Sequence, residues 1–136
     1  MSERDATETI RIAAALLLGP DGRALLVRKH GTTAFMQPGG KIEPGETPVD
    51  ALARELHEEL AVSLPEGASR HLGRFSAPAA NEPGRRVEAD VFRVDWHGLV
   101  APAAEIAEAR WVDPASPGDI ELAPLTRSHV LPLAVR

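Results

Sequence analysis

The sequence predicts an α/β fold of the α+β type, a mixed curved sheet between helices that cover both of its faces. Two observations lead to this prediction. Residues 10–18 are apolar on both alternating faces, as is typical of a strand that is covered on both sides. A helix with one apolar stripe follows a Gly/Pro-rich loop, and a second helix is expected near the C-terminus. All 136 residues are expected to form one domain, which would bury about two-thirds of its unfolded surface.

The remaining elements follow from local patterns along the chain. Pro20 to Gly22 form a turn signal. In the strand expected at 86–96, the alternation of apolar residues slips between Val91 and Phe92, which indicates a bulge or two-sided burial. Pro124 and Pro132 restrict the start and the end of the closing helix. The expected elements are a tail at 1–8, strands at 10–18, 24–27, 71–76, 86–96 and 109–113, a helix beginning at 48, and a closing helix at 122–133.

Charge and composition narrow the class of function. The net charge is −5, and residues 40–62 contain six acids against two bases, so most of the excess is concentrated in one segment. This concentration favours cation binding over a general nucleic-acid surface. The chain has no cysteine, no signal-like apolar N-terminus and no apolar run long enough for a membrane span. We therefore expect a cytoplasmic protein with no membrane or nucleic-acid partner, and the sequence leaves a homodimer open.

The predicted helix after Thr47 carries an unusual group of acids. Thr47 suits an N-cap, Pro48 suits the first helical position, and Asp50 stands where a capping-box acid would. The apolar stripe that should face a core comprises Val49, Leu52, Ala53, Leu56 and Leu60. Glu55, Glu58 and Glu59 are spaced i, i+3, i+4, so their side chains should converge beside that stripe. Three converging carboxylates repel one another and need a counterion. The counterion is either a bound cation or, as in many solvated acidic faces, nearby bases such as Arg54.

The loop before this helix favours the cation. Residues 37–46 hold three glycines and two prolines, which allow the backbone to approach a ligand closely. With this loop the segment resembles the signature of the Nudix hydrolase family: Gly, five residues, Glu, seven residues, Arg-Glu, an aliphatic, any residue, Glu-Glu, any residue, Gly, an aliphatic. The matching residues are Gly40, Glu46, Arg54, Glu55, Leu56, Glu58, Glu59 and Val62. Ala61 stands where the family usually has glycine, which puts the helix exit in doubt and removes no ligand.

Carboxylate oxygens beside a backbone carbonyl suit Mg²⁺ or Mn²⁺, and the lack of cysteine or clustered histidine argues against zinc. The resemblance implies an α/β/α sandwich in which Glu55, Glu58, Glu59 and the Gly39 carbonyl bind the metal. It also implies that Glu46, Arg54 and Gly40 support and orient these ligands. The general base is either Glu55 or Glu105, with Glu108 as a rival. Either of the last two acids would otherwise be a solvated loop carboxylate.

The resemblance implies hydrolysis of a nucleoside diphosphate linked to another group. Lys41, Arg28 and Lys29 are the candidate phosphate-binding cations, although strand-end charge is an equal explanation for the last two. Phe35 is the candidate base-stacking residue. The substrate is expected to be a nucleoside triphosphate, oxidised or noncanonical, with ADP-ribose or a nucleotide sugar as the alternative. A sensor that binds a nucleotide without cleaving it is the alternative from another class. Specificity is expected to lie in residues 31–37, 77–86 and 101–108.

Overall fold

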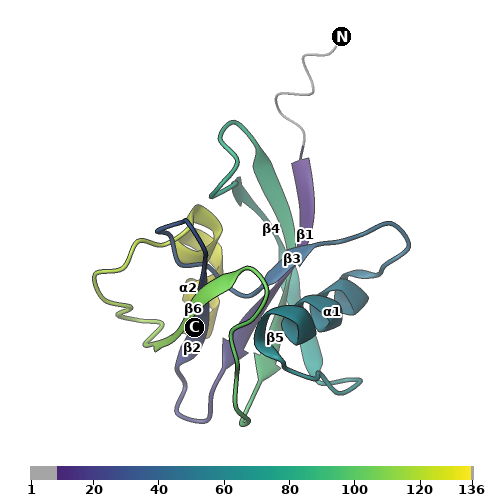
Figure 1. Ribbon diagram of the computed structural model, residues 1–136. Coiled ribbons are helices and arrows are strands. Elements are labelled where there is room, and N and C mark those ends of the chain that lie inside the picture. Colours follow the sequence, from purple (N-terminus) through teal and green to yellow (C-terminus); the bar gives the residue numbers. More distant parts are fainter. Residues whose placement is uncertain (1–8, 136) are drawn as a thin grey trace.

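The computed structural model describes residues 9–135, and the expected tail at 1–8 lies outside this range. Its centre is a six-stranded sheet in the order β4-β5-β1-β2-β6, with β3 paired to β1 (Figure 1). β1 and β5 are parallel and the other pairs are antiparallel, so the sheet is mixed, as predicted. The strands are β1 (Thr9–Leu18), β2 (Ala24–Lys29), β3 (Gly39–Lys41), β4 (Ser69–Pro78), β5 (Arg86–Asp95) and β6 (Ile106–Val112).

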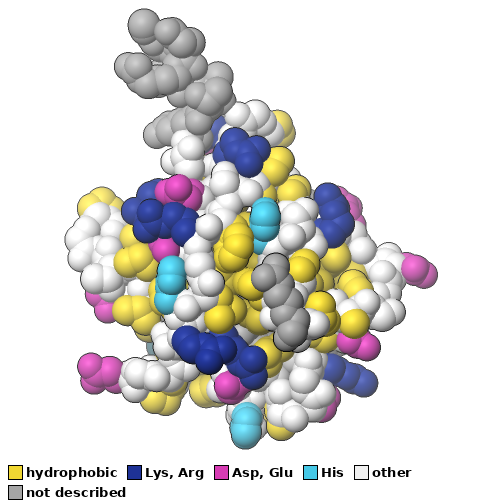
Figure 2. All heavy atoms as spheres, turned by 180° about the vertical axis from the view of Figure 1, so that it is seen from behind, with side chains coloured by type: hydrophobic (Ala, Val, Ile, Leu, Met, Phe, Trp, Pro, Cys, Tyr) yellow, Lys and Arg dark blue, Asp and Glu magenta, His cyan; other side chains and the backbone are white. Residues whose placement is uncertain are grey.

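Helices cover the two faces of this sheet. Alternate residues of β1 face opposite sides, so Ala13, Ala15 and Leu17 pack under α1 (Pro48–Leu60) in one core cluster. Leu16 and its even-numbered neighbours pack in a second cluster with the C-terminal segment, in which η2 (Thr126–Val130) leads into α2 (Leu131–Ala134). Figure 1 shows α1 and α2 on different sides of the strands, which confirms the predicted layering. The back of the molecule shows hydrophobic side chains gathered around the C-terminal end, where Val135 is exposed (Figure 2).

A separation between β1 and β2 positions the glycine loop. The two strands pair at Leu18 and Ala24, next to their connecting turn, and residues 36–41 fill the widening space beyond it. Met36 pairs with Val27 on the β2 side, and the Ala15 amide donates to the Pro38 carbonyl at 2.9 Å on the β1 side. β3 then runs antiparallel to residues 12–14 of β1. The loop is therefore held between two central strands and lies close to α1.

The start and end of α1 agree with the capping pattern. The Thr47 hydroxyl accepts from the Asp50 amide at 3.2 Å, and the Asp50 carboxylate accepts from the Thr47 amide, which completes the predicted capping box. At the other end, Ala61 adopts a left-handed conformation (φ 58°, ψ 31°), the strained alternative for this exit, and its amide donates to the His57 carbonyl. The capping box therefore sets the start of the helix, whereas the left-handed exit forms at Ala61 although the glycine that favours it is missing.

The predicted apolar stripe of α1 is partly wrong. Leu52, Leu56 and Leu60 are fully buried, as expected, but Val49 is 41% exposed and Ala51 is buried in its place. Ala53 is only half-buried.

β5 is buried on both faces around Val91 and Phe92, which is one of the two predicted explanations of the parity slip, and the nearby bulge lies in β4, between His71 and Gly73. Two boundaries differ from the expectation. β6 begins at Ile106 and so includes Glu108, which was expected in a loop. Pro132 does not end the closing helix, because a π-type turn precedes it. No helix within residues 9–135 has the length and hydropathy that crossing a membrane requires.

Candidate active site

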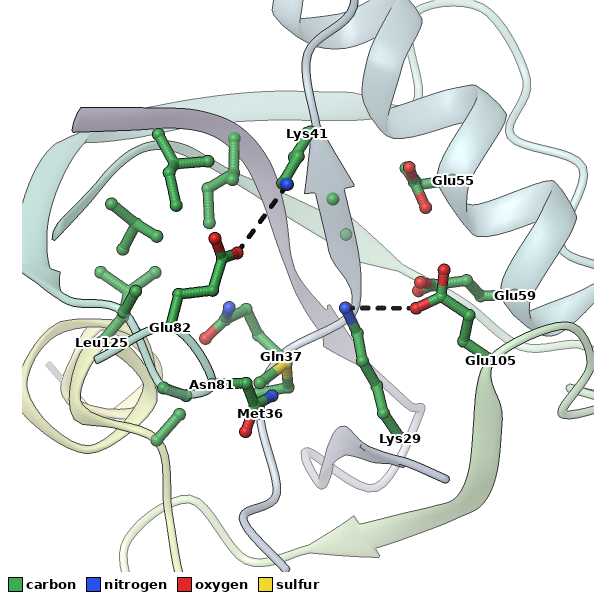
Figure 3. A pocket seen from close by; sticks show the side chains of 18 of the residues that line it. Lys29, Met36, Gln37, Lys41, Glu55, Glu59, Asn81, Glu82, Glu105 and Leu125 are labelled. Carbon is green, nitrogen blue, oxygen red and sulfur yellow. Dashed lines mark ion pairs between the residues drawn. The ribbon is translucent and has the colours of Figure 1, made fainter. Parts of the chain in front are cut away.

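A cavity of about 360 Å³ opens between the glycine loop, β1, α1 and two surface loops (Figure 3). One end is acidic, and the other end is lined mainly by aliphatic side chains. It is lined by Ile10, Ile12, Lys29, Met36, Gln37, Gly39, Gly40, Lys41, Glu43, Glu55, Glu59, Pro78, Ala79, Ala80, Asn81, Glu82, Val87, Glu105, Ala123 and Leu125. The structure thus brings the predicted loop, helix acids and lysines together around one space.

Glu59 is the most deeply placed acid of this cavity. It is 6% exposed, and its Oε1 has no hydrogen-bond partner in the described part of the chain. Burial, reinforced by the neighbouring Glu55 carboxylate, raises the pKa of Glu59 to about 8, although Lys29 and the Gly39 amide act in the opposite direction. When Glu59 is ionised, its buried Oε1 has no positively charged hydrogen-bond partner in the described part of the chain. A divalent cation would supply that charge, so the residues present fit a metal.

Arg54 holds Glu55 in place from the outer side of the site. Its Nε and Nη2 donate to the two carboxylate oxygens of Glu46 at 2.6 and 2.9 Å, and its Nη1 donates to Glu55 at 3.0 Å. The bidentate bond lowers the pKa of Glu46 to about 2 and raises that of Arg54. A fourth bond from Arg54 reaches the Lys41 carbonyl at 3.0 Å. The network joins helix to loop, the arrangement expected of Glu46 and Arg54.

Gly40 allows Glu55 to lie against the backbone of the loop. A Cβ atom at this position would lie 2.5 Å from the Glu55 carboxylate carbon and from one of its oxygens. Gly39 is equally crowded on its other side, where a Cβ would overlap the Ala13 carbonyl, and its φ of +140° favours glycine. Both glycines are therefore required by close approach, which is what the loop composition suggested.

Glu58 departs from the expected convergence of three carboxylates. Its side chain is about half exposed and its Oε1 lies 3.4 Å from Arg54 Nη1, outside the cavity lining. Only Glu55 and Glu59 of the helix acids line the cavity, and within the described range no three acidic or imidazole side chains form a preassembled metal cluster. The expectation that all three side chains converge is therefore wrong for this rotamer of Glu58.

Two lysines face the acids across the cavity (Figure 3). Lys29 Nζ lies 3.5 Å from Glu105 Oε1, and Lys41 Nζ lies 3.8 Å from Glu82 Oε2. Figure 3 shows the Glu105 and Glu59 carboxylates next to each other, so the late acid does reach the site.

Arg28, a candidate phosphate ligand, does not line the cavity. It pairs with Glu108 at 3.4 Å and donates to the Thr32 carbonyl, because neighbouring strand residues face opposite sides.

The other two expected residues also lie elsewhere. Phe35 is 5% exposed in the second core cluster, beneath the Arg110 guanidinium at 4.8 Å, so no base can stack on it there. Glu108 accepts from Arg110 at 2.7 Å, and this bond, with a further one from Arg28, lowers the pKa of Glu108. A carboxylate held in this way outside the cavity is not the base.

The sequence interpretation missed the polar residues at the aliphatic end. Gln37 and Asn81 line the cavity there, as does Glu82, which contacts Lys41. The segments 31–37 and 77–86 are expected to govern specificity, and Gln37 also belongs to the glycine loop, but the sequence does not distinguish Gln37, Asn81 or Glu82 from their neighbours in these segments.

Comparisons with known proteins agree with this fold and identify the family. A model of the NUDIX domain matches residues 8–133. The 8-oxo-dGTP diphosphatase of Escherichia coli K12 is 29% identical over 94 residues, covering 65% of this chain and 69% of that protein. An RNA pyrophosphohydrolase of Halorhodospira halophila is 37% identical over 67 residues, covering 46% and 37%. The chain spans less than half the length of the first curated relatives that it matches.

A solved structure gives the same result for the fold alone. The MutT protein of Methanosarcina mazei Go1 superposes with a TM-score of 0.78 at 24% identity, covering 96% of this chain and 95% of that one. The matched domain model spans nearly the whole sequence, including the glycine loop, the acidic helix and the loop that carries Glu105. The chain belongs to the Nudix hydrolase family.

Proposed function

We propose that this protein is a Mg²⁺-dependent hydrolase that cleaves a nucleoside triphosphate, oxidised or noncanonical, to the monophosphate and pyrophosphate. The observation that carries the proposal is the buried Glu59 carboxyl group beside Glu55, with an unpaired oxygen, at one end of a cavity of nucleotide-binding size. Nudix proteins generally depend on a divalent metal and act on nucleotide-type small molecules. The diphosphatase and pyrophosphohydrolase names of the relatives support the same reaction class.

The chain's own residues have distinct roles in this proposal. Glu55 and Glu59, with the Gly39 carbonyl, would hold the metal, and Glu58 would join them by leaving Arg54. When bound, the metal would neutralise the diphosphate and supply an activated water. Lys29 and Lys41 would exchange their carboxylate partners for phosphate oxygens. The water oxygen bonds to phosphorus as the bridging P–O bond breaks.

The proton of the attacking water goes to a carboxylate of the site. Glu105 lies beside Glu59 in Figure 3 and is the better placed base, whereas Arg54 already engages Glu55. Glu105→Gln should therefore lower kcat strongly. If Glu55 were the base, Glu105→Gln would leave kcat nearly unchanged.

A hydrolysis panel tests the function. It contains nucleoside triphosphates, oxidised nucleotides, ADP-ribose and nucleotide sugars, each with Mg²⁺, with Mn²⁺ and with EDTA. We expect metal-dependent release of pyrophosphate from triphosphates, and loss of release in Glu58→Gln and Glu59→Gln with the fold retained. Cleavage of ADP-ribose alone would instead favour the pyrophosphatase alternative, for which Pro78 at the cavity is a weak pointer. Tight nucleotide binding without cleavage would favour the sensor.

A further inference from the structure

The side chains that line the aliphatic end of the cavity would bind a nucleobase without distinguishing one nucleobase from another. Ile12 and Val87 lie on the sheet side, and Leu125 comes from the C-terminal segment. Among the described residues that line the cavity, none is aromatic. A flat ring between aliphatic side chains gains burial energy whatever its substituents are. Discrimination between bases must therefore come from the few polar groups at this end.

Gln37 is a buried polar group held in one orientation. It is 7% exposed, and Thr126, which fixes it, is fully buried. The Thr126 hydroxyl accepts from the Gln37 amide N–H of the backbone at 3.3 Å and lies 2.7 Å from Gln37 Oε1. Because the hydroxyl has one proton and needs an acceptor for it, it donates that proton to Oε1. The oxygen end of the carboxamide therefore faces Thr126.

The nitrogen end of the same carboxamide is left for a ligand. Gln37 Nε2 has no acceptor among residues 9–135, although its side chain lines the cavity. Figure 3 shows this side chain reaching into the space between Met36 and Leu125. Glu59 Oε1 is the one fully buried polar side-chain atom without a partner among the described residues, so the Gln37 N–H group opens into the cavity and can donate to an acceptor bound there. Asn81 also lines this end, but it is exposed on a loop and can present either end of its amide.

We infer that Gln37 is a specificity-determining residue that selects bases with an exocyclic carbonyl oxygen on the edge far from the sugar. That oxygen is O6 of a purine or O4 of a pyrimidine, and it accepts from Nε2. A freely rotating glutamine reads adenine well, because it can offer a donor and an acceptor together. Here Thr126 engages the acceptor, so an amino group at the same place would confront N–H with N–H. This inference rests on the proposed function.

The test compares nucleotide pairs that differ by oxo against amino at one carbon and, with it, by a proton on the adjacent ring nitrogen. We expect kcat/KM to be about tenfold or more higher for ITP than for ATP, and for UTP than for CTP, the value of one well-formed base contact. Gln37→Met keeps a similar volume and removes the donor, so both ratios should fall toward one. Thr126→Val keeps the shape and frees the carboxamide, so the ratios should fall because the amino substrates gain.

A matched control and a binding readout separate the possible failures. Ser128→Ala removes a hydroxyl from the same helical segment as Thr126, at an exposed position outside the cavity, and it should leave both ratios unchanged. Hydrolysis with wild-type ratios near one, or unchanged ratios in Gln37→Met, overturns the inference and leaves the proposed function standing. If no nucleotide is hydrolysed, the proposed function fails. Calorimetric binding of ITP and ATP in EDTA then decides: equal affinities, or a preference that survives Gln37→Met, overturn the inference as well.

Discussion

Replacing Glu59 with Gln is expected to remove a pH dependence that this carboxyl group imposes on the stability of the metal-free protein. Burial and the Glu55 carboxylate raise the pKa of Glu59 in the folded state from 4.5 to about 8. Between these two values the folded protein keeps a proton that the unfolded chain has released. The free energy of unfolding therefore falls as the pH rises. The stabilising contribution is complete below the unfolded pKa and is lost as the pH rises through the folded one.

The size of the effect follows from the same shift. Each pH unit inside this window changes the free energy of unfolding by up to about 1.4 kcal/mol. Because the surroundings of Glu59 relax when it ionises, we expect about 2 kcal/mol in total between pH 5 and pH 8. For a chain of this length that corresponds to roughly 6–10 °C in Tm. Mg²⁺ added at pH 8 should restore much of the lost free energy of unfolding, because it binds the folded state.

The assay is thermal unfolding in EDTA at four pH values between 5 and 8. The quantity compared is the Tm of wild type minus that of Glu59→Gln, because all other ionisable groups are the same in the two proteins. This difference should decrease steadily as the pH rises. Glu58→Gln is the matched control, since that carboxylate is about half exposed, and it should keep the wild-type profile. A difference that is constant across the range would refute the assignment of Glu59 as a buried, unpaired acid.

Three further changes test the loop, the helix exit and the arginine network. Gly40→Ala places a Cβ 2.5 Å from the Glu55 carboxylate, so Mg²⁺ affinity should fall by about 10–100-fold while far-UV circular dichroism is retained. Ala61→Gly removes the cost of a left-handed alanine and should raise the free energy of unfolding by about 1 kcal/mol in denaturant titrations; no gain would mean that the strain is absent. Glu46→Gln weakens the hold of Arg54 and should lower kcat/KM about 10–100-fold, whereas the exposed Glu66→Gln should change nothing.

Much of α1 was predictable because its signals are local. The bonds between Thr47 and Asp50 span three residues and depend on no other part of the fold. The apolar stripe was predicted less accurately than the capping box, because periodicity gives the direction of a side chain but not the extent of the surface that covers it. Val49 lies in the first turn and is left exposed, whereas Leu52 is covered.

Spacing likewise predicts the positions of the helix acids better than their contacts. Glu58 and Glu59 are adjacent in sequence, about 100° apart around the helix. Arg54 lies one turn before Glu58 and attracts its carboxylate, whereas Glu59 points inward, where no base lies close enough to pair with it. The sequence correctly indicated that a charge was needed at this face. It did not show which of the acids a neighbouring base already neutralises.

The aliphatic end of the cavity illustrates the limit of reasoning from sequence. Gln37 and Thr126 are 89 residues apart, and no spacing rule joins them. Their contact exists because residues 36–41 are inserted between β1 and β2, which brings the loop against the C-terminal helix on the far face of the sheet. The metal end, by contrast, lies largely within one continuous segment whose ligand spacing is visible in the chain. The proposed metal ligands are therefore predictable from one segment of sequence, while the proposed choice of nucleobase depends on contacts that only the folded sheet creates.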